Sequence, residues 1–326
     1  IEAVFGIWAL FLMTALIPVA GEEAVVHYLS DGSKFIEPVM VFVIMTIAAT
    51  APVMYAAEKM ILKISHLLPM PNMMAFYFTA LTMGPLLGSF ITEPAAMTVT
   101  ALILKTGFFD QSHITRNFKY ATLGALFVNI SIGGTLTHFA APPVLMVAGP
   151  WEGDIQVMMT RFGWKAAIAV FINVIVTMFV FRDQLQGSIN EDHVARPNAR
   201  DPKAWIVLVH IAFLALAVWY AHYIPILLGL LIFFVGWCKI SYQYQERLHI
   251  KEALLVGFFL AGLVVIGKLQ AWWIKPLIGR VPESFMYLGA TGLTAFTDNA
   301  ALTYLGTLVD GLSDSVKYFR VAGAVT

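Results

Sequence analysis

Two stretches of this chain are copies of one pattern, and each places a carboxylate inside an otherwise apolar segment. Residues 92–98 read Thr-Glu-Pro-Ala-Ala-Met-Thr, and residues 297–303 read Thr-Asp-Asn-Ala-Ala-Leu-Thr. The same register pairs small and hydroxyl residues upstream of both motifs: Gly84 with Gly289, and Ser89 with Thr294. Interrupted apolar segments at corresponding places in two halves are typical of transporters built from internal repeats. We therefore expect a fold of two related halves that share one polar site.

The composition indicates that both copies lie in a membrane. Hydrophobic residues make up 59% of the chain and charged residues only 12%, about half the charged fraction of a soluble domain. Uncharged or nearly uncharged runs, each about long enough to cross roughly 30 Å of hydrocarbon as a helix, cover residues 3–20, 38–57, 164–181, 204–221, 223–238 and 253–267. Helices satisfy their own backbone groups in lipid. The prediction is an all-α, multi-pass protein integral to the cell (inner) membrane, with the lipid bilayer as its first partner.

The segments that carry the two motifs read as re-entrant helical hairpins. Residues 71–106 form two apolar arms broken at Gly84-Pro85 and at the carboxylate motif, because proline removes a backbone donor and glycine loosens a helix. Residues 284–310 repeat the arrangement without the prolines.

If both segments are re-entrant hairpins, the connections between the helices fall into two groups, one on each side of the membrane. One face receives residues 57–70, 105–119, 182–203 and 239–251, and the other receives 21–36, 149–165, 221–223, 268–283 and 311–320. The first face holds the larger share of the 20 Lys and Arg residues, so the positive-inside bias makes it cytoplasmic. The hairpin at 71–106 then enters from the cytoplasm and the hairpin at 284–310 from the opposite face, as an inverted-topology repeat requires.

A polar segment, residues 182–203, separates a first repeat (1–181) from a second (204–326). In the first repeat, residues 118–148 read as a broken transmembrane helix, because two glycines and two prolines interrupt the run. Unwound backbone at membrane depth is tolerated where it is buried in protein or lines a wet cavity, and there its carbonyls can coordinate an ion. The second copy reaches the comparable place near Val316, so we expect the chain to end inside a truncated second broken helix.

Several classes of function are disfavoured. The net charge is zero, with 20 basic and 20 acidic residues, which gives no basic patch for nucleic acid. The single cysteine, Cys238, excludes a disulfide framework and reads as an apolar helix residue. Neither His-Glu-x-x-His nor Gly-x-Gly-Asp occurs, so neither a zinc protease nor an intramembrane aspartyl protease is indicated. We expect no enzyme activity and no cofactor.

The two carboxylate motifs, together with the Gly-Gly-Thr and Ala-Pro-Pro break, resemble the ion-transporter superfamily, whose members include sodium/proton antiporters, arsenite permeases and citrate or dicarboxylate carriers. The resemblance is greatest to its bacterial sodium/proton antiporter family and spans nearly the whole chain. It implies a homodimer in which each protomer has a scaffold domain and a transport domain with two hairpins, and in which the substrate moves by an elevator-like shift.

The resemblance also implies which residues bind the transported ion. In that family the hairpin tips and the broken helices form the ion site. The corresponding residues of this chain are Thr92, Glu93, Thr297, Asp298 and Asn299 at the tips, and Asn129, Gly134, Thr135 and Thr137 at the break. The tips depart from the Ser-Asn-Thr pattern of the superfamily's carboxylate carriers.

Electrostatics favours a cation over an anion at this site. Two unit charges about 6 Å apart at an effective dielectric of about 20 interact by roughly 3 kcal/mol, so Glu93 and Asp298 would repel citrate or succinate. Sodium prefers oxygen ligands, and hydroxyls, amide oxygens, carboxylates and free carbonyls are available. A buried carboxyl tends to hold a proton until a cation displaces it. Proton and cation then compete for one position, and this competition couples their movements in opposite directions.

The predicted function is a secondary active transporter that exchanges sodium or lithium for protons. Asp298 is ranked first as the exchanging group, and Glu93 is its charge partner or a ligand of a second ion. The alternative is a sodium-coupled carrier of an organic anion, such as a dicarboxylate or citrate, or an arsenite transporter of the same fold. His138, in the unwound stretch, reads as a pH sensor or as a hydrogen-bonded structural imidazole. For Asn173 and His210, which lie in apolar runs, we favour a structural role in joining helices.

Overall fold

A computed structural model describes residues 2–111, 114–151, 153–186, 201–278, 281–309 and 313–325. Every regular element in these ranges is helical, and none is a strand, which confirms the all-α prediction. Among the described residues, four helices are long and apolar enough to cross a membrane: Ala3–Ala20, Asn72–Ile91, Ile155–Val180 and Ile250–Leu269. Most of the predicted linker, residues 182–203, lies outside the described ranges.

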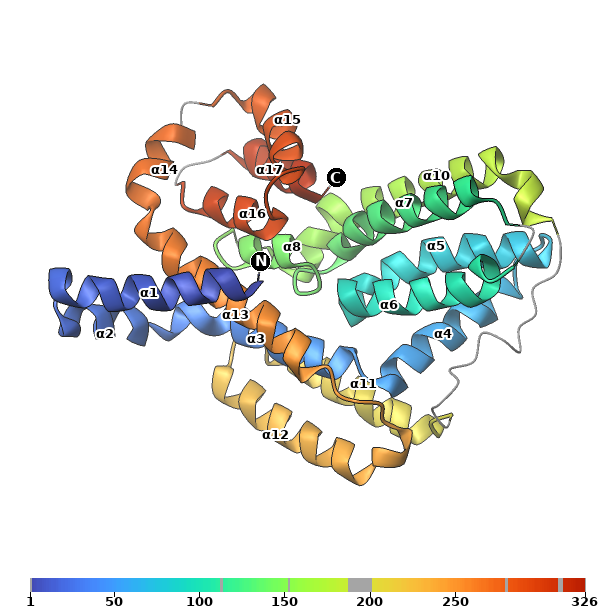
Figure 1. The fold of residues 1–326 in the computed structure, drawn as a ribbon, viewed down its shortest axis with the longest axis horizontal. Coiled ribbons are helices and arrows are strands. Elements are labelled where there is room, and N and C mark those ends of the chain that lie inside the picture. Colours follow the sequence, from blue (N-terminus) through green and yellow to red (C-terminus); the bar gives the residue numbers. More distant parts are fainter. Residues whose placement is uncertain are drawn as a thin grey trace.

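The apolar run at residues 38–57 is not one continuous helix, as the sequence suggested, but two helices joined at a bend. Helices α3 (Ile36–Ala48) and α4 (Ala51–Ser65) meet at an angle of 67°. Pro52 lies in the first turn of α4 and lacks the N–H that would continue the hydrogen bonds of α3, so the helix ends before it. This bend turns α4 toward α5, as Figure 1 shows.

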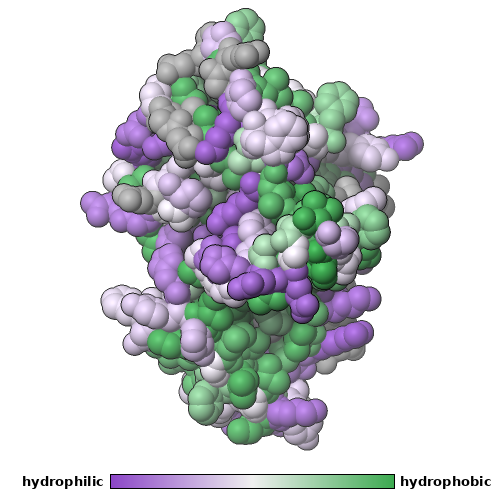
Figure 2. Space-filling model, turned by 90° about the vertical axis from the view of Figure 1, so that its left-hand side faces the viewer, coloured by the Kyte–Doolittle hydropathy of each residue, from purple (hydrophilic) through white to green (hydrophobic). Residues whose placement is uncertain are grey.

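One group of helices packs around α3 and α13 (Ile250–Leu269). Helix α1 (Glu2–Ala20) lies along α13, and α11 (Ala204–Trp219) and α12 (Ile224–Ile240) lie on α3 (Figure 1). A side chain at Gly262 would come within 2.6 Å of the Phe5 backbone, so glycine permits the close approach of α1 to α13, as small residues do between membrane helices. Figure 2 shows hydrophobic side chains gathered over the lower part of one face, a surface suited to lipid.

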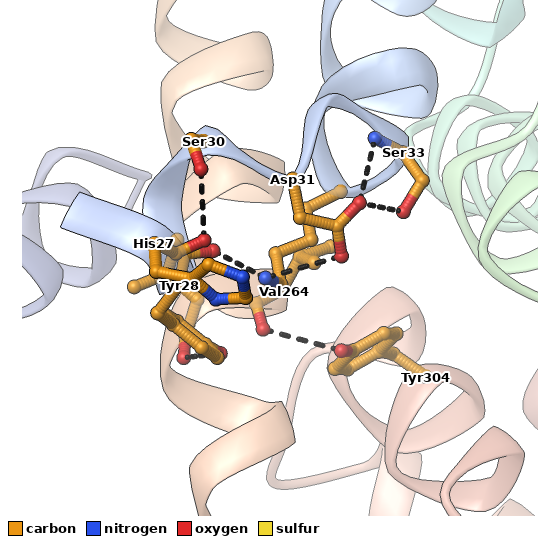
Figure 3. A network of polar contacts seen from close by, with 9 residues as sticks. His27, Tyr28, Ser30, Asp31, Ser33, Val264 and Tyr304 are labelled. Carbon is orange, nitrogen blue, oxygen red and sulfur yellow. Dashed lines mark hydrogen bonds and ion pairs between the residues drawn. The ribbon is translucent and has the colours of Figure 1, made fainter. Parts of the chain in front are cut away.

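A polar network fastens the N-terminal segment to this group (Figure 3). Tyr28 of α2 (Glu22–Ser30) donates to the carbonyl of Val265 at 2.9 Å, and Tyr304, which comes from the second half, donates to the neighbouring carbonyl of Val264 at 3.2 Å. Two tyrosines from opposite ends of the chain therefore bind consecutive carbonyls of α13.

The first predicted hairpin is a pair of packed helices. Helices α5 (Asn72–Ile91) and α6 (Glu93–Leu104) run back along each other with Thr92 as the turn. The break predicted at Gly84-Pro85 is wrong, because α5 continues through Pro85. The Leu81 carbonyl, which Pro85 has no N–H to bond, accepts from the Asn129 amide. A Cβ at Gly84 would lie 2.1 Å from the Thr100 hydroxyl, and one at Gly88 would lie 3.3 Å from the Ala96 Cβ. These glycines therefore set the spacing of the arms. The hairpin packs against α4, α7 (Arg116–Gly133) and α10 (Trp164–Val180).

The second hairpin repeats the order of elements but not the packing. Helix α15 (Glu283–Thr294) lies on α17 (Asp314–Val325), as α5 lies on α7, whereas α16 (Asn299–Thr307) packs mainly on α8 (Pro142–Ala148). Nothing lies within 4 Å of a Cβ built at Gly289, the counterpart of Gly84. A cavity of about 300 Å³ separates the arms there, bordered also by α14 (Ala271–Ile278). The second hairpin is therefore splayed.

Short elements complete the chain: α9 (Ile155–Met158), and the 3₁₀ or π turns Gly32–Phe35, Lys105–Phe109, Gly134–Leu136, Met159–Gly163, Arg182–Leu185 and Tyr242–Tyr244. Connections predicted to share a face contact one another. The backbone N–H of Thr115 donates to Gln184 at 2.9 Å on one face. On the other, Arg161 pairs with Asp314 at 3.3 Å and Lys165 donates to Tyr318 at 3.0 Å.

Candidate functional site

The tip of the first hairpin is a single residue in an unusual conformation. Thr92 has φ 71° and ψ 151°, and it is the one non-glycine residue with positive φ in the described ranges. Such a conformation is costly for a β-branched residue and is found where the surroundings enforce it, often at functional sites. The Thr92 hydroxyl is buried, and no hydrogen-bond partner for it lies among the described residues.

The tip lies beside the predicted break in the transmembrane helix. Helix α7 ends at Gly133, one 3₁₀ turn follows at Gly134–Leu136, and regular α-helix resumes at Pro142 as α8. The unwound stretch between these helices is therefore confirmed. Both prolines fall in the first turn of α8, where a missing N–H costs nothing.

Hydroxyl groups of the hairpin satisfy the unwound backbone. Ser89 of α5 donates to the Gly133 carbonyl at 2.6 Å and accepts from the Leu136 N–H at 2.9 Å. The Thr137 hydroxyl donates a hydrogen bond to the Ser89 carbonyl at 2.5 Å. Ser89 is not among the site residues predicted from the sequence, although its pairing with Thr294 in the repeat is a signal that could have identified it.

Glu93 lies against the same stretch. A Cβ at Gly134 would come within 2.7 Å of the Glu93 Oε1 atom, so a glycine is needed there to accommodate the carboxylate. The Glu93 side chain is half-buried, and within the described residues it forms no ion pair. A carboxylate beside unwound backbone, without a paired cation, is available to a proton or to a cation from outside the protein.

The other residues predicted at the break play different parts. Asn129 is fully buried; its amide donates to the Leu81 carbonyl at 3.1 Å and its carbonyl accepts from Asn173 at 3.0 Å. These bonds join α5, α7 and α10, which agrees with the structural role expected for Asn173. The Thr135 hydroxyl donates to the Ile132 carbonyl at 2.8 Å at the end of α7. Gly134 contacts Glu93 at the tip, and Thr137 bonds to α5 close to it. Asn129 joins the surrounding helices, whereas Thr135 bonds only within the end of α7.

The second tip is exposed. Asp298 caps α16, and its Oδ1 atom accepts from the Ala301 N–H at 2.9 Å. Thr297 donates to the Leu293 carbonyl at 2.9 Å, and Asn299 begins the helix. Phe296 beside them is 91% exposed. In the described part of the chain, no hydrogen bond or ion pair joins this tip to Glu93 or to the unwound stretch, so a pocket shared by both carboxylates stays a prediction.

The broken helix nevertheless connects the two hairpins. Its first half, α7, packs on α5 and α6, and its second half, α8, packs on α16. His138, in the unwound stretch, lines a cavity, and its Nδ1 atom is buried without a hydrogen-bond partner among the described residues. His210, by contrast, has its Nδ1 atom 2.7 Å from the Ile206 carbonyl, in keeping with a structural role.

The comparisons with known proteins bear on this arrangement. No curated protein matches the chain. One family profile does, the one described as "Putative Na+/H+ antiporter", and the match runs over residues 1–326. Because that match covers the whole of the chain, the protein belongs to the Na+/H+ antiporter family that this profile defines.

Proposed function

We propose that the chain exchanges sodium or lithium for protons across the cell (inner) membrane, and that Glu93 is the group at which cation and proton compete. The observation that carries this proposal is the position of Glu93, which lies against the unwound stretch at Gly134 with no ion-pair partner in the described residues. A carboxylate in such surroundings exchanges a proton for a cation without further machinery.

Oxygen ligands for the cation are close at hand. The free Thr92 hydroxyl stands at the tip, and the unwound stretch offers carbonyls outside regular α-helix. Hard cations bind such oxygen sets. Thr137 adds a hydroxyl that already reaches the tip through Ser89. A carboxylate at the centre of this set disfavours an anionic substrate, which makes organic-anion transport the weaker alternative.

We further propose that the second hairpin closes and brings its tip to the ion. Closure of the splayed hairpin would bring α15 and α16 together as α5 and α6 are, and would carry Thr297, Asp298 and Asn299 toward the broken helix on which α16 packs. We take the two hairpins as inverted, re-entrant repeats of one transport domain that moves in an elevator-like shift within a homodimer. Asp298, ranked first from the sequence, becomes the second carboxylate because Glu93 is the less exposed of the two.

Full-length protein in lipid vesicles with a trapped pH dye tests the proposal. Addition of sodium or lithium to wild-type vesicles should move protons. Glu93→Gln should lower the rate by at least about 100-fold, because the amide neither exchanges a proton nor attracts the cation with a charge worth roughly 3 kcal/mol. Glu252→Gln, a change at an exposed residue of α13, serves as the control and should keep the wild-type rate. Sodium-driven uptake of labelled citrate or succinate, with no proton movement, would refute exchange in favour of anion transport.

A further inference from the structure

The cavity that His138 lines includes no residue of the first hairpin among its described lining residues. Its volume is about 470 Å³. Its walls come from α3, from the unwound stretch and α8, and from the connections before α9 and α12. They carry four ionisable side chains: Glu37, His138, Asp154 and His222. None of the four is among the residues that the sequence predicted to bind the ion.

Glu37 is a half-buried carboxylate in the wall of this cavity. It lies in the first turn of α3, directly before Pro38, where the helix dipole favours a negative charge. A Cβ at Gly149 would come within 2.7 Å of its Oε1 atom. The small residue at the end of α8 therefore leaves room for this carboxylate, just as Gly134 leaves room for Glu93.

The described residues that line the cavity include two carboxylates, Glu37 and Asp154, and neither lysine nor arginine. His222 and Lys268 are near enough to interact with Glu37 electrostatically, but neither forms an ion pair with it in the described part of the chain. Asp154 is exposed and caps α9 by accepting from the Val157 N–H at 2.7 Å. Carboxylates in a cleft with low-dielectric walls focus the potential and concentrate cations.

The inner wall is shared with the candidate ion site. His138 belongs to the unwound stretch, and its buried Nδ1 atom has no partner among the described residues. Gly134, which is four residues earlier in the same stretch, contacts Glu93. The cavity and the first hairpin tip therefore contact the same short piece of backbone.

The cavity suits a hydrated cation and not a chelated metal. At about 30 Å³ per water molecule, a volume of about 470 Å³ has room for an ion with its water shell. No three His, Cys, Asp or Glu side chains of the described residues converge closely enough to hold a metal ion. Binding here is expected to be weak and electrostatic, which suits a place that an ion must also leave.

We propose that this cavity is the vestibule through which the transported monovalent cation reaches the site, with Glu37 as its anchoring carboxylate. The inference rests on the proposed exchange function. The connections at its rim, 149–165 and 221–223, belong to the face that the sequence assigned opposite to the cytoplasm. The vestibule therefore serves one side of the membrane.

The test compares wild type with Glu37→Gln in right-side-out and everted membrane vesicles, with exchange followed by pH dye. The KM for sodium should rise about five- to tenfold when sodium is presented to the vestibule face, as expected for one charge interaction through water, and should stay unchanged on the other face. Added choline chloride should shrink the difference, because the Debye length falls from about 10 Å at 0.1 M salt to about 3 Å at 1 M. A purely structural defect would not depend on salt in this way.

Two further variants serve as comparisons, one outside the cavity and one that acts on Glu37 indirectly. Glu23→Gln changes an exposed acid of α2 that does not line the cavity and should leave KM unchanged. Gly149→Ala should displace the Glu37 carboxylate and raise KM on the same face as Glu37→Gln. An unchanged KM in Glu37→Gln, or an equal rise on both faces, would overturn the vestibule while the exchange function stands. Wild-type protein that moves no protons would overturn both.

Discussion

At the scale of single residues, the two carboxylates of the repeat stand in different surroundings. Glu93 lies half-buried against Gly134, whereas Asp298 is exposed and caps a helix. Asparagine caps helices as well as aspartate does, so Asp298→Asn removes the charge and keeps the cap. We expect this variant to retain wild-type thermal stability and to lose about tenfold in exchange rate, which is less than the loss in Glu93→Gln. Vesicle assays of both variants measure the ranking, and a larger loss in Asp298→Asn would restore Asp298 to first place.

Thr92 offers a second residue-scale prediction. Glycine adopts φ 71° without strain, so Thr92→Gly should keep or raise the melting temperature while it removes the free hydroxyl. If that hydroxyl is a cation ligand, the KM for sodium rises and the proton-driven rate at saturating sodium stays near wild type. A fall in melting temperature would show that the threonine has packing contacts that outweigh the strain of its backbone.

Among the elements, the two hairpins give a matched pair of glycines. A Cβ at Gly84 would lie 2.1 Å from the Thr100 hydroxyl, whereas nothing lies within 4 Å of one at Gly289. Gly84→Ala should therefore destabilise the protein by about 1–3 kcal/mol through overpacking, and Thr100→Ala should restore part of the loss. Gly289→Ala should be neutral, or stabilising by up to about 1 kcal/mol from helix propensity. Thermal melting in detergent compares them; equal destabilisation would mean that the second hairpin is closed in solution.

The turn between α2 and α3 gives a prediction about pH. Asp31 accepts hydrogen bonds from Ser33 and pairs with Lys34 at 3.2 Å (Figure 3), and these contacts lower its pKa to about 2. A depressed carboxylate pKa contributes stability above its ordinary value, near 4, and this contribution is lost as the pH falls toward 2. The melting temperature of wild type should exceed that of Asp31→Asn by a constant amount from pH 7 to 5, and the gap should close below about pH 4. A gap that persists at low pH would contradict this.

Some elements could be predicted from the sequence because their causes are local. Prolines and glycines mark the break after α7, Pro94 marks the hairpin turn at Thr92, and the long apolar runs mark most of the helices. Gly84-Pro85 marks no break, because α5 runs through it. The splay of the second hairpin could not be predicted, since it follows from α16 packing on α8, far away in the chain. Glu37 was overlooked for the same reason, because its importance depends on Gly149 lying beneath it in the fold.

At the scale of the whole molecule, the pairing of connections predicts which positions share a side of the membrane. Gln184 binds Thr115 at one end, and Arg161 pairs with Asp314 at the other. We expect a cysteine introduced at Asp183 to react with a membrane-impermeant thiol reagent from the cytoplasmic side, and one at Asp314 from the opposite side. Cys238 is buried and only 5% exposed, so the parent chain should stay unlabelled. Labelling of both positions from one side would contradict the two-face arrangement.

The two tyrosines that bind α13 limit how the second hairpin can move. Tyr28 and Tyr304 donate hydrogen bonds to consecutive backbone carbonyls, those of Val265 and Val264. The N-terminal segment and the second hairpin are therefore both attached to α13. If α16 slides along α13, the Tyr304 hydroxyl must break its hydrogen bond to the Val264 carbonyl. The next carbonyl on the same face of α13 lies one helical turn, or about 5.4 Å, away. The second hairpin would then move relative to α13 in discrete steps, and the length of each step would be set by the pitch of α13.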